Sequence, residues 1–451
     1  MMVICLIFSC FISFSYTAYF IPSQTQFYNL LKWEEFQSDV ILIPKVGPIL
    51  NNYKLNSKIT SFYYSNSNNK AIIVNDIFPQ IYYNNLQGNR LIVNGQTAIY
   101  INKKITLQNV YEFDSNGLED NHFRGTERQS GYGWVGYIQH SSFNYIYDRG
   151  HFSIGRGNPF FYNINESLLL NKSFPPVEYI LWHHVRDWFS FDWAILFLSE
   201  RNNSNRFLAF HRYGIERKKW RVGFTEAVLG SYINLGSEEL GYMMPGVVHI
   251  ETEENRGINT NLMWLVDGYL KWNSWNIYGE LLIDDFALDA DSPAQLAFNL
   301  GVGKEIEKFF LNIDYTHINA WTGNHCNPSQ NWVERSVPIG NSIGSNANSL
   351  LVSINTFINE ISSVELYINR SYQTNNTASE NLEYWPDEIL CDHNFDDIQI
   401  NLGKKELIDI FGFSIDFLVK GNYLLELDFT SNPAHKENEI SINVLYGYKT
   451  N

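Results

Sequence analysis

Residues 423–430 have the sequence YLLELDFT, in which every odd position is apolar. Three of the even positions are polar, namely Glu426, Asp428 and Thr430. Side chains along a β-strand point alternately to its two faces, so this stretch predicts a strand with one apolar and one polar face. Residues 440–448 continue the pattern, with apolar side chains at the even positions and mostly small or polar residues between them.

The same period of two recurs along much of the chain, for example in residues 218–225, 309–316, 364–369 and 411–417. With further stretches of this kind it predicts an all-β protein of about 16 to 18 antiparallel strands. In a soluble sandwich the polar faces would meet water, whereas in a transmembrane β-barrel they would face the lumen and the apolar faces would meet lipid. Aromatic residues near the ends of several strands, as in a membrane-interface girdle, favour the transmembrane barrel.

The composition of the 451-residue chain agrees with a barrel and excludes several other classes. The chain is 45% hydrophobic and 16% aromatic, which is too apolar for an intrinsically disordered protein. A mean hydropathy of -0.23, with no long apolar run beyond the N-terminal segment, excludes a bundle of membrane-spanning helices. The formal net charge of -16 argues against a nucleic-acid partner, which a basic surface would attract.

The N-terminus has the features of an export signal. Met2 to Phe14 form an apolar stretch that is too short to span a membrane, and small residues follow it. We therefore expect a signal peptide over residues 1–15. No linker divides the rest of the chain, so residues 16–451 are expected to form one exported β-barrel domain.

Two cysteines, Cys326 and Cys391, remain in the exported part of the chain. Export leads to an oxidising compartment, where a disulfide can form. Two predicted strands separate the loops that contain the cysteines, and in an up-and-down barrel two strands return the chain to the same end. A disulfide between them is therefore allowed. A zinc site made of His325, Cys326, Cys391 and His393 is the alternative, although its spacing is not a standard one.

Seven polar residues are expected to face the lumen as a network that either stabilises the barrel or contacts a ligand. They are Arg156, His211, Arg212, Glu226, Glu280, Asp284 and Asp285. Arg212 and Glu226 lie on neighbouring predicted strands and carry opposite charges, as a buried ion-pair network requires.

The chain is not predicted to be an enzyme, and no cofactor or metal is expected. Glu280, Asp284 and Asp285 could act on a sugar by acid–base catalysis. However, adjacent residues of a strand point to opposite faces, so Asp284 and Asp285 are poorly placed to act together. A place near the barrel rim, with one carboxylate paired inside, is the preferred interpretation.

Residues 277–285, IYGELLIDD, and residues 299–301, NLG, form the most distinctive sequence of the chain. Residues 208–213, LAFHRY, and 223–228, GFTEAV, precede them. In order and spacing these motifs resemble the capsule assembly Wzi family of bacterial outer membranes. The similarity extends over about residues 130–370, and the two ends of the chain match poorly.

This resemblance implies an outer-membrane β-barrel, with short helical segments in its loops, that aids the assembly or attachment of capsular or other surface polysaccharide. It implies no catalytic centre. The expected partners are surface polysaccharide and outer-membrane lipid, and we expect a monomer. One departure is that Gly155-Arg156 is followed by Gly157-Asn158, where the family has a Trp-Gly pair. The polysaccharide contacts are therefore not assigned to residues.

Two alternative functions remain open at this point. A porin-like outer-membrane channel needs an open lumen, which large charged side chains facing inward would fill. A secreted all-β protein that acts on glycans would be soluble without detergent. An open lumen or solubility without detergent would therefore distinguish these alternatives from a polysaccharide-binding membrane barrel.

Overall fold

The computed structural model describes most of the chain between residues 72 and 446. Residues 1–15, Cys326 and Cys391 lie outside the described residues, so the signal peptide, the disulfide and the alternative zinc site stay predictions. The described residues are 20–21, 49–50, 72–84, 88–101, 104–115, 135–159, 167–171, 174–233, 236–256, 260–285, 295–320, 322–325, 327–335, 337–359, 362–374, 405–419, 423–432 and 437–446.

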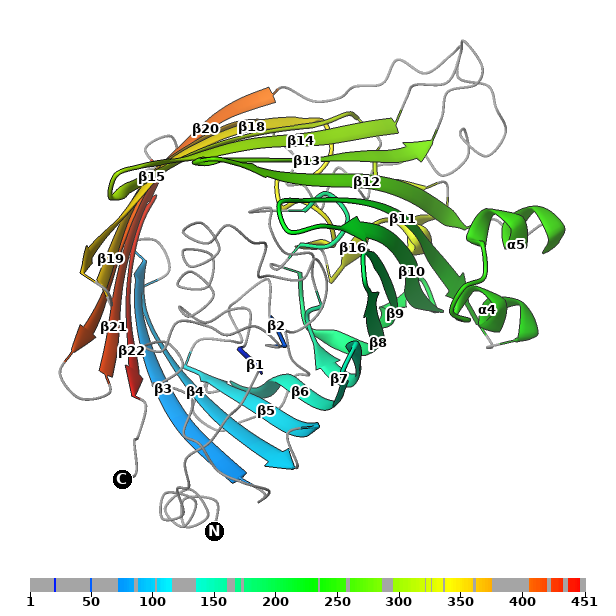
Figure 1. Cartoon of the computed structure of the whole chain (residues 1–451), viewed down its shortest axis with the longest axis horizontal. Helices are drawn as coiled ribbons and strands as arrows, with labels where there is room; N and C mark the ends of the chain where they lie inside the picture. Colours follow the sequence, from blue (N-terminus) through cyan, green and yellow to red (C-terminus); the bar gives the residue numbers. More distant parts are fainter. Residues whose placement is uncertain are drawn as a thin grey trace.

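Within these residues, eighteen strands form one closed antiparallel barrel, in which neighbours in sequence pair and the last strand pairs with the first (Figure 1). This confirms the prediction of an all-β transmembrane barrel with about 16 to 18 strands. The strands are β3 (Ile72–Asn84), β4 (Gly88–Ile101), β5 (Ile105–Asp114), β6 (Val135–Tyr147), β7 (Gly150–Gly157), β8 (Val177–Arg186), β9 (Phe189–Arg201), β10 (Ser204–Glu216), β11 (Trp220–Tyr232), β12 (Asn261–Trp272), β13 (Trp275–Asp285), β14 (Gln295–Ile306), β15 (Phe309–Ile318), β18 (Ala347–Asn359), β19 (Ser362–Thr374), β20 (Lys405–Val419), β21 (Tyr423–Asn432) and β22 (Glu437–Tyr446).

A few short elements lie outside the barrel sheet. The described part of the chain contains no helix that is long and apolar enough to cross a membrane. The short elements are the strand pairs β1 (Phe20–Ile21) with β2 (Ile49–Leu50) and β16 (Val333–Glu334) with β17 (Val337–Pro338), the helices α4 (Ser237–Tyr242) and α5 (His249–Arg256), and the 3-10 helix η2 (Pro328–Gln330).

The connections between strands differ at the two ends of the barrel. At one end, short turns join β8 to β9, β10 to β11, β12 to β13 and β14 to β15. At the other end, residues 158–176, 233–260 and 319–346 form long connections. We call these ends the short-turn end and the long-loop end.

Asparagine and aspartate shape the tight turns. Asn202 and Asn203, between β9 and β10, have φ angles of 49° and 58°. A two-residue turn with both residues in this left-handed region matches the twist of the flanking strands, and asparagine tolerates that region better than most residues. Asp187 and Asn273 adopt the same region between β8 and β9 and between β12 and β13. The turn sequences therefore favour the observed hairpins.

On the strands whose side chains are described, the outward face of the barrel carries a band of exposed apolar side chains. Along each strand these side chains occupy alternate positions, while the residues between them are mostly buried toward the lumen. This is the arrangement that lipid contact requires. Members of the band are Tyr213, Ile215, Val222, Phe224, Val266, Leu270, Ile277, Leu281, Leu300, Val302, Ile313, Tyr315, Leu350, Ile354, Leu366 and Ile368.

Aromatic side chains gather on the outward face at the short-turn end. Trp188, Trp220 and Trp272 are exposed there, in a turn or at the end of a strand. The Lys304 ammonium group lies 4.4 Å from the centre of the Trp275 ring. Aromatic rings beside cationic groups suit the boundary between lipid and water, so this girdle marks one edge of the membrane-embedded band.

Part of the lumen is filled by a packed apolar core. Inward-facing residues near the long-loop end, such as Leu196, Leu208 and Leu229, pack against residues from two loops. We call the described residues within 158–176 and 319–346 the plug. Its core residues are Leu168, Leu169, Leu170, Phe174, Trp332, Ile339 and Ile343. The two loops therefore fold back into the barrel lumen and pack against the inner face of strands β8 to β15.

The connection between β11 and β12 runs along the outer wall. Helices α4 and α5 lie outside the barrel in Figure 1, and they confirm the prediction of short helical segments in a loop. Tyr242 and Met243 form a core with outward-facing side chains, namely Trp193, Ile195, Phe207, Ala209 and Val228. The connection also exposes Leu240, Met244 and Val248. An apolar surface at this place continues the lipid-facing band.

Substitution of Val266, in the middle of β12, tests whether the outward face of the barrel contacts lipid. Its cross-strand neighbours Phe224 and Leu281 are exposed on the same face. Val266→Arg would place a charge in lipid and should lower the free energy of unfolding by about 2–4 kcal/mol. The control Val266→Leu should change it little. Guanidinium unfolding of the protein in lipid vesicles measures both, and equal stability of the two variants would contradict the assignment.

Candidate functional site

The lumenal ion cluster has Arg212 of β10 at its centre. The guanidinium donates to both carboxylate oxygens of Asp267 on β12, at 2.8 and 3.0 Å, and to one oxygen of Asp192 on β9, at 3.3 Å. The other Asp192 oxygen contacts Nδ1 of His183 on β8. All four residues are buried. A buried cation needs opposite charges and hydrogen bonds, and the two aspartates provide both.

Two glycines make room for this guanidinium. A Cβ atom at Gly223 on β11 would overlap the Arg212 guanidinium and the Asp267 carboxylate. A Cβ atom at Gly214, two residues after Arg212, would overlap the same guanidinium and the Ser190 hydroxyl. Glycine within a strand often marks such a close approach. Gly223 and Gly214 therefore leave the space that the Arg212 guanidinium occupies.

Glu280 of β13 is a lumenal residue, and it holds the first loop of the plug. Its buried carboxylate accepts hydrogen bonds from the Ser167 hydroxyl, at 3.0 Å, and from the Leu168 amide, at 2.8 Å. The wall of the barrel therefore supplies the acceptor that this loop backbone needs when it leaves water.

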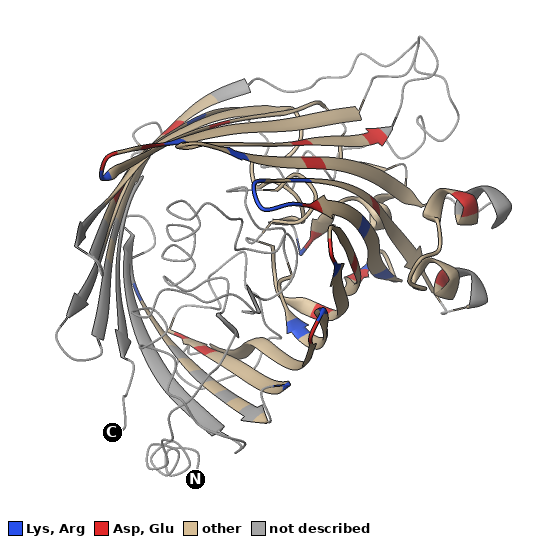
Figure 2. Ribbon diagram, in the orientation of Figure 1, with Lys and Arg blue, Asp and Glu red and all other residues tan. Residues whose placement is uncertain are grey.

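Arg206 of β10 holds the second loop of the plug. Its buried guanidinium donates to three backbone carbonyl groups, those of Ser329, Asn331 and Val333. A carboxylate oxygen of Glu334 lies 3.8 Å from Nη1 of Arg206 and provides a buried counter-charge. The same carboxylate accepts a hydrogen bond from the Ser199 amide at 3.0 Å. Charged acceptors and donors in the wall thus replace the water that these loop groups would otherwise bind. Acidic and basic positions are interspersed on the ribbon of this wall (Figure 2).

The two loops are also joined to each other. The Trp332 indole N–H donates to the Leu169 carbonyl at 2.9 Å, and the Asn171 amide donates to the Ile339 carbonyl at 2.8 Å. Gly340 lies against the Leu168 carbonyl, and a Cβ atom there would overlap it. The plug is therefore one packed unit that the barrel wall holds at several points.

Asp284 and Asp285 lie at the end of β13 near the long-loop end. Asp284 is half-buried and accepts a hydrogen bond from the Gly323 amide of the plug at 2.7 Å. The side chain of Asp285 lies outside the described part of the structure. Asp284 therefore acts with Glu280 in holding the plug, as an acceptor for backbone groups.

Arg156 lies on the outer wall, so its prediction as a lumenal residue is wrong. Ile154 on the same strand is exposed on the lipid-facing side, and Arg156, two residues later, shares that face. Its guanidinium forms an ion pair with Glu178, the residue directly opposite on β8. The pair lies near the long-loop end, where the strands leave the membrane-embedded band.

His211 and Glu226 also lie on the outer wall, and the prediction that they face the lumen is wrong. They are directly opposite each other on β10 and β11, whereas Arg212 is opposite Thr225. Arg212 and Glu226 consequently point to different sides of the sheet, and the expected ion pair between them does not form. Both outer-wall residues are buried because the α4–α5 connection covers them.

Glu226 receives the start of helix α5. Its carboxylate accepts hydrogen bonds from the backbone amides of His249, at 2.7 Å, and Ile250, at 3.2 Å. These amides belong to the first turn of the helix, which has no internal acceptors for them. Burial lowers the pKa of the His249 side chain to about 4, so that imidazole is neutral near pH 7. His249 is a neighbour of His211 and Glu226 that the sequence analysis did not identify.

The plug loop contains a sequence with the spacing of a serine nucleophile motif, Gly340-Asn341-Ser342-Ile343-Gly344. In hydrolases this motif joins a strand to a helix at a sharp turn. Here it lies between β17 and β18, and the Ser342 side chain is exposed. The motif therefore lacks the strand-to-helix turn that positions a catalytic serine in hydrolases.

Several residues of the lumenal site were not identified from the sequence, namely Asp192, Arg206, Asp267 and Glu334. One signal was present, because Arg206 and Arg212 occupy positions of the same parity and share the inward face of β10. The pairing of strands was also needed, since it places Asp192 directly opposite Arg212. Alternation alone does not define that pairing.

The fold is similar to that of solved outer-membrane barrels. One is Wzi, which is described as an outer membrane protein involved in group 1 capsule assembly in Escherichia coli and as a carbohydrate-binding β-barrel. It superposes with a TM-score of 0.66 at 9% identity, covering 96% of this chain and 100% of that one. OpdK of Pseudomonas aeruginosa, solved with vanillate, gives a TM-score of 0.51 at 9% identity, covering 84% and 98%.

These similarities establish the fold, and they confirm the predicted likeness to the Wzi barrel at that level. No family model and no curated protein matches the chain. The identity of 9% is too low to transfer a ligand or an activity. The architecture is that of a bacterial outer-membrane β-barrel.

Arg212→Ala tests the lumenal ion cluster. It would leave Asp192 and Asp267 buried without their cation and should lower the free energy of unfolding by about 3–5 kcal/mol. Arg370→Ala is the control, because Arg370 pairs with Asp409 in an exposed position and such pairs contribute little. Heat-modifiable mobility in gel electrophoresis reports the unfolding temperature, and equal temperatures for both variants would rule out a stabilising cluster.

Proposed function

We propose that the chain is a non-enzymatic protein of the bacterial outer membrane that binds surface polysaccharide and aids its attachment or assembly at the cell. The shared fold with a carbohydrate-binding barrel, over 96% of the chain, supports this proposal. The observation that carries it is the plug, because a packed loop core inside the lumen is suited to a binding protein more than to an open channel.

The long-loop end is the proposed polysaccharide-binding side. It corresponds to the cell exterior by the rule that barrel loops are longer there. Exposed or half-buried residues of the plug loop, such as Asn327, Ser342 and Asn346, carry amide and hydroxyl groups. Such groups donate to and accept from sugar hydroxyls. The plug would hold them on a rigid support, which lowers the entropy cost of binding.

The proposal is tested by deleting the gene in the native cell and measuring the polysaccharide that stays with washed cells and the polysaccharide released to the medium. We expect the cell-associated fraction to fall and the released fraction to rise, since synthesis would continue without attachment. Re-expression of the wild-type chain should restore the distribution. An unchanged distribution would refute the proposed role.

A porin-like channel remains the second candidate, because OpdK shares the fold. Planar-bilayer recordings separate the two functions. The wild-type protein should show little steady conductance, and replacing residues 322–344 by a short flexible linker should increase it, because the second loop of the plug would be removed while β15 and β18 stay connected. A large steady conductance of the wild-type protein would instead favour the channel.

A further inference from the structure

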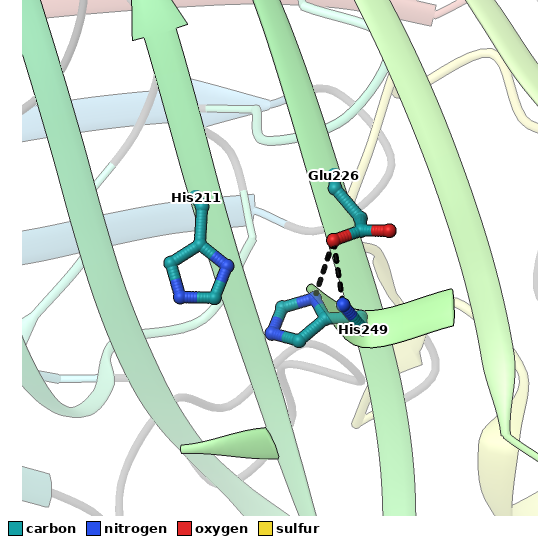
Figure 3. Close-up of side chains that lie close together, drawn as sticks. All are labelled: His211, Glu226 and His249. Atoms are coloured by element: carbon teal, nitrogen blue, oxygen red, sulfur yellow. Dashed lines mark hydrogen bonds and ion pairs between the residues drawn. The ribbon is translucent and has the colours of Figure 1, made fainter. Parts of the chain in front are cut away.

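Three side chains that commonly bind metal ions lie together on the outer wall of the barrel. They are His211 of β10, Glu226 of β11 and His249, the first residue of α5 (Figure 3). Each offers one ligand atom, and these atoms lie within 4.8 Å of one another. All three residues are buried between the sheet and the α4–α5 connection. We call them the outer-wall triad.

The sheet and the helix both help to assemble the outer-wall triad. His211 and Glu226 are direct cross-strand partners, so their side chains leave the sheet next to each other on the same face. Glu226 binds the first amides of α5, and this contact brings the His249 ring to 4.4 Å from the His211 ring, measured between ring centres. The position of the His249 side chain therefore depends on Glu226.

Hydrogen bonds define which imidazole nitrogens are available. His211 Nε2 lies 3.1 Å from the Met244 carbonyl, and His249 Nε2 lies 3.1 Å from the Tyr242 carbonyl. A carbonyl only accepts, so Nε2 carries a hydrogen in both rings, and in the neutral imidazole Nδ1 then keeps a lone pair. Both Nδ1 atoms are buried, and neither has a hydrogen-bond partner among the described residues. His249 Nδ1 lies 3.8 Å from a Glu226 oxygen.

This arrangement brings three electron-pair donors together without a hydrogen or a cation between them. Two neutral imidazole nitrogens and a carboxylate repel one another at close range, and a buried acceptor without a partner costs about 1–3 kcal/mol. A bound metal ion would give both imidazole nitrogens a partner and would balance the charge of the carboxylate. The remaining carboxylate lone pairs still serve the α5 amides, because a carboxylate offers about four acceptor sites.

We propose that His211, Glu226 and His249 form a binding site for a divalent transition-metal ion, with zinc as the best match. Zinc takes nitrogen and oxygen ligands, often three from protein and one from water. Ligand histidines usually donate their other N–H to a carbonyl or carboxylate, as both rings do here. Magnesium and calcium prefer oxygen ligands and fit less well. In a tetrahedral site the ligand atoms are about 3.3 Å apart, so binding would draw the triad closer.

The site would join the barrel wall to the connection outside it. Two ligands come from the sheet, and the third comes from the segment that also exposes Leu240, Met244 and Val248. A metal ion at the triad would therefore hold a lipid-facing segment against the barrel. Its role would be structural and separate from polysaccharide binding, since the triad lies on the opposite face of the sheet from the plug.

The experiment uses the full chain, refolded in detergent with zinc chloride or with EDTA and then desalted. Refolding is used because the triad is buried in the folded protein. Elemental analysis should find one zinc per chain after refolding with zinc, and the zinc-loaded protein should unfold at a higher temperature than the EDTA sample. X-ray absorption should show nitrogen and oxygen ligands at about 2.0–2.1 Å and no sulfur at about 2.3 Å, which excludes binding by cysteines.

Glu226→Gln and His249→Gln should each weaken zinc binding at least tenfold, about the smallest loss seen when a supporting residue of a metal site is removed. His184→Gln is the matched control, because His184 lies on the same wall but its Nδ1 contacts the Tyr147 hydroxyl. It should bind zinc like the wild type. Heat-modifiable mobility shows whether each variant folds, and the X-ray absorption spectrum of the wild type tests the ligands independently. Less than one zinc per wild-type chain, or unchanged affinity in the folded triad variants, would overturn the proposal.

Discussion

The side chains of a closed sheet alternate between its two faces, and this constraint determines which residues of the barrel can meet. Lipid leaves no partner for an unpaired backbone group, so the sheet must close, and each strand must send every second side chain to the lumen. A shift of one residue reverses the environment of a side chain completely. On β10, Arg212 reaches the lumenal aspartates, whereas His211 reaches the helices outside.

The same constraint explains how two loops come to fill part of the lumen. Loop backbone that leaves water needs hydrogen-bond partners, and a sheet whose own backbone is already paired can offer only side chains. Arg206 of β10 and Glu280 of β13 supply those side chains, and apolar residues of the wall near the long-loop end pack against the plug. Buried charges and the plug therefore depend on each other, since each would be costly without the other.

The sequence predicted the barrel, its approximate number of strands, the likeness to the Wzi fold and the lumenal positions of Arg212 and Glu280, because these follow from periodicity and from motifs. It did not predict which residues meet. The sequence suggests an ion pair between Glu226 and Arg212, yet strand register places Glu226 opposite His211 on the other face of the sheet. His249 is distant in sequence and reaches the wall only through the fold of the α4–α5 connection, so a site that includes it could not be found from spacing.

Amide hydrogen exchange of the protein in lipid nanodiscs measures whether the plug is a packed unit inside the barrel. The Leu168 and Gly323 amides donate to Glu280 and Asp284, and the Asn171 amide donates to the second loop. If the plug is a packed unit held by the barrel wall, these amides should exchange as slowly as amides in the barrel strands. Exchange as fast as that of exposed loop amides would show that the two loops are not packed in the lumen.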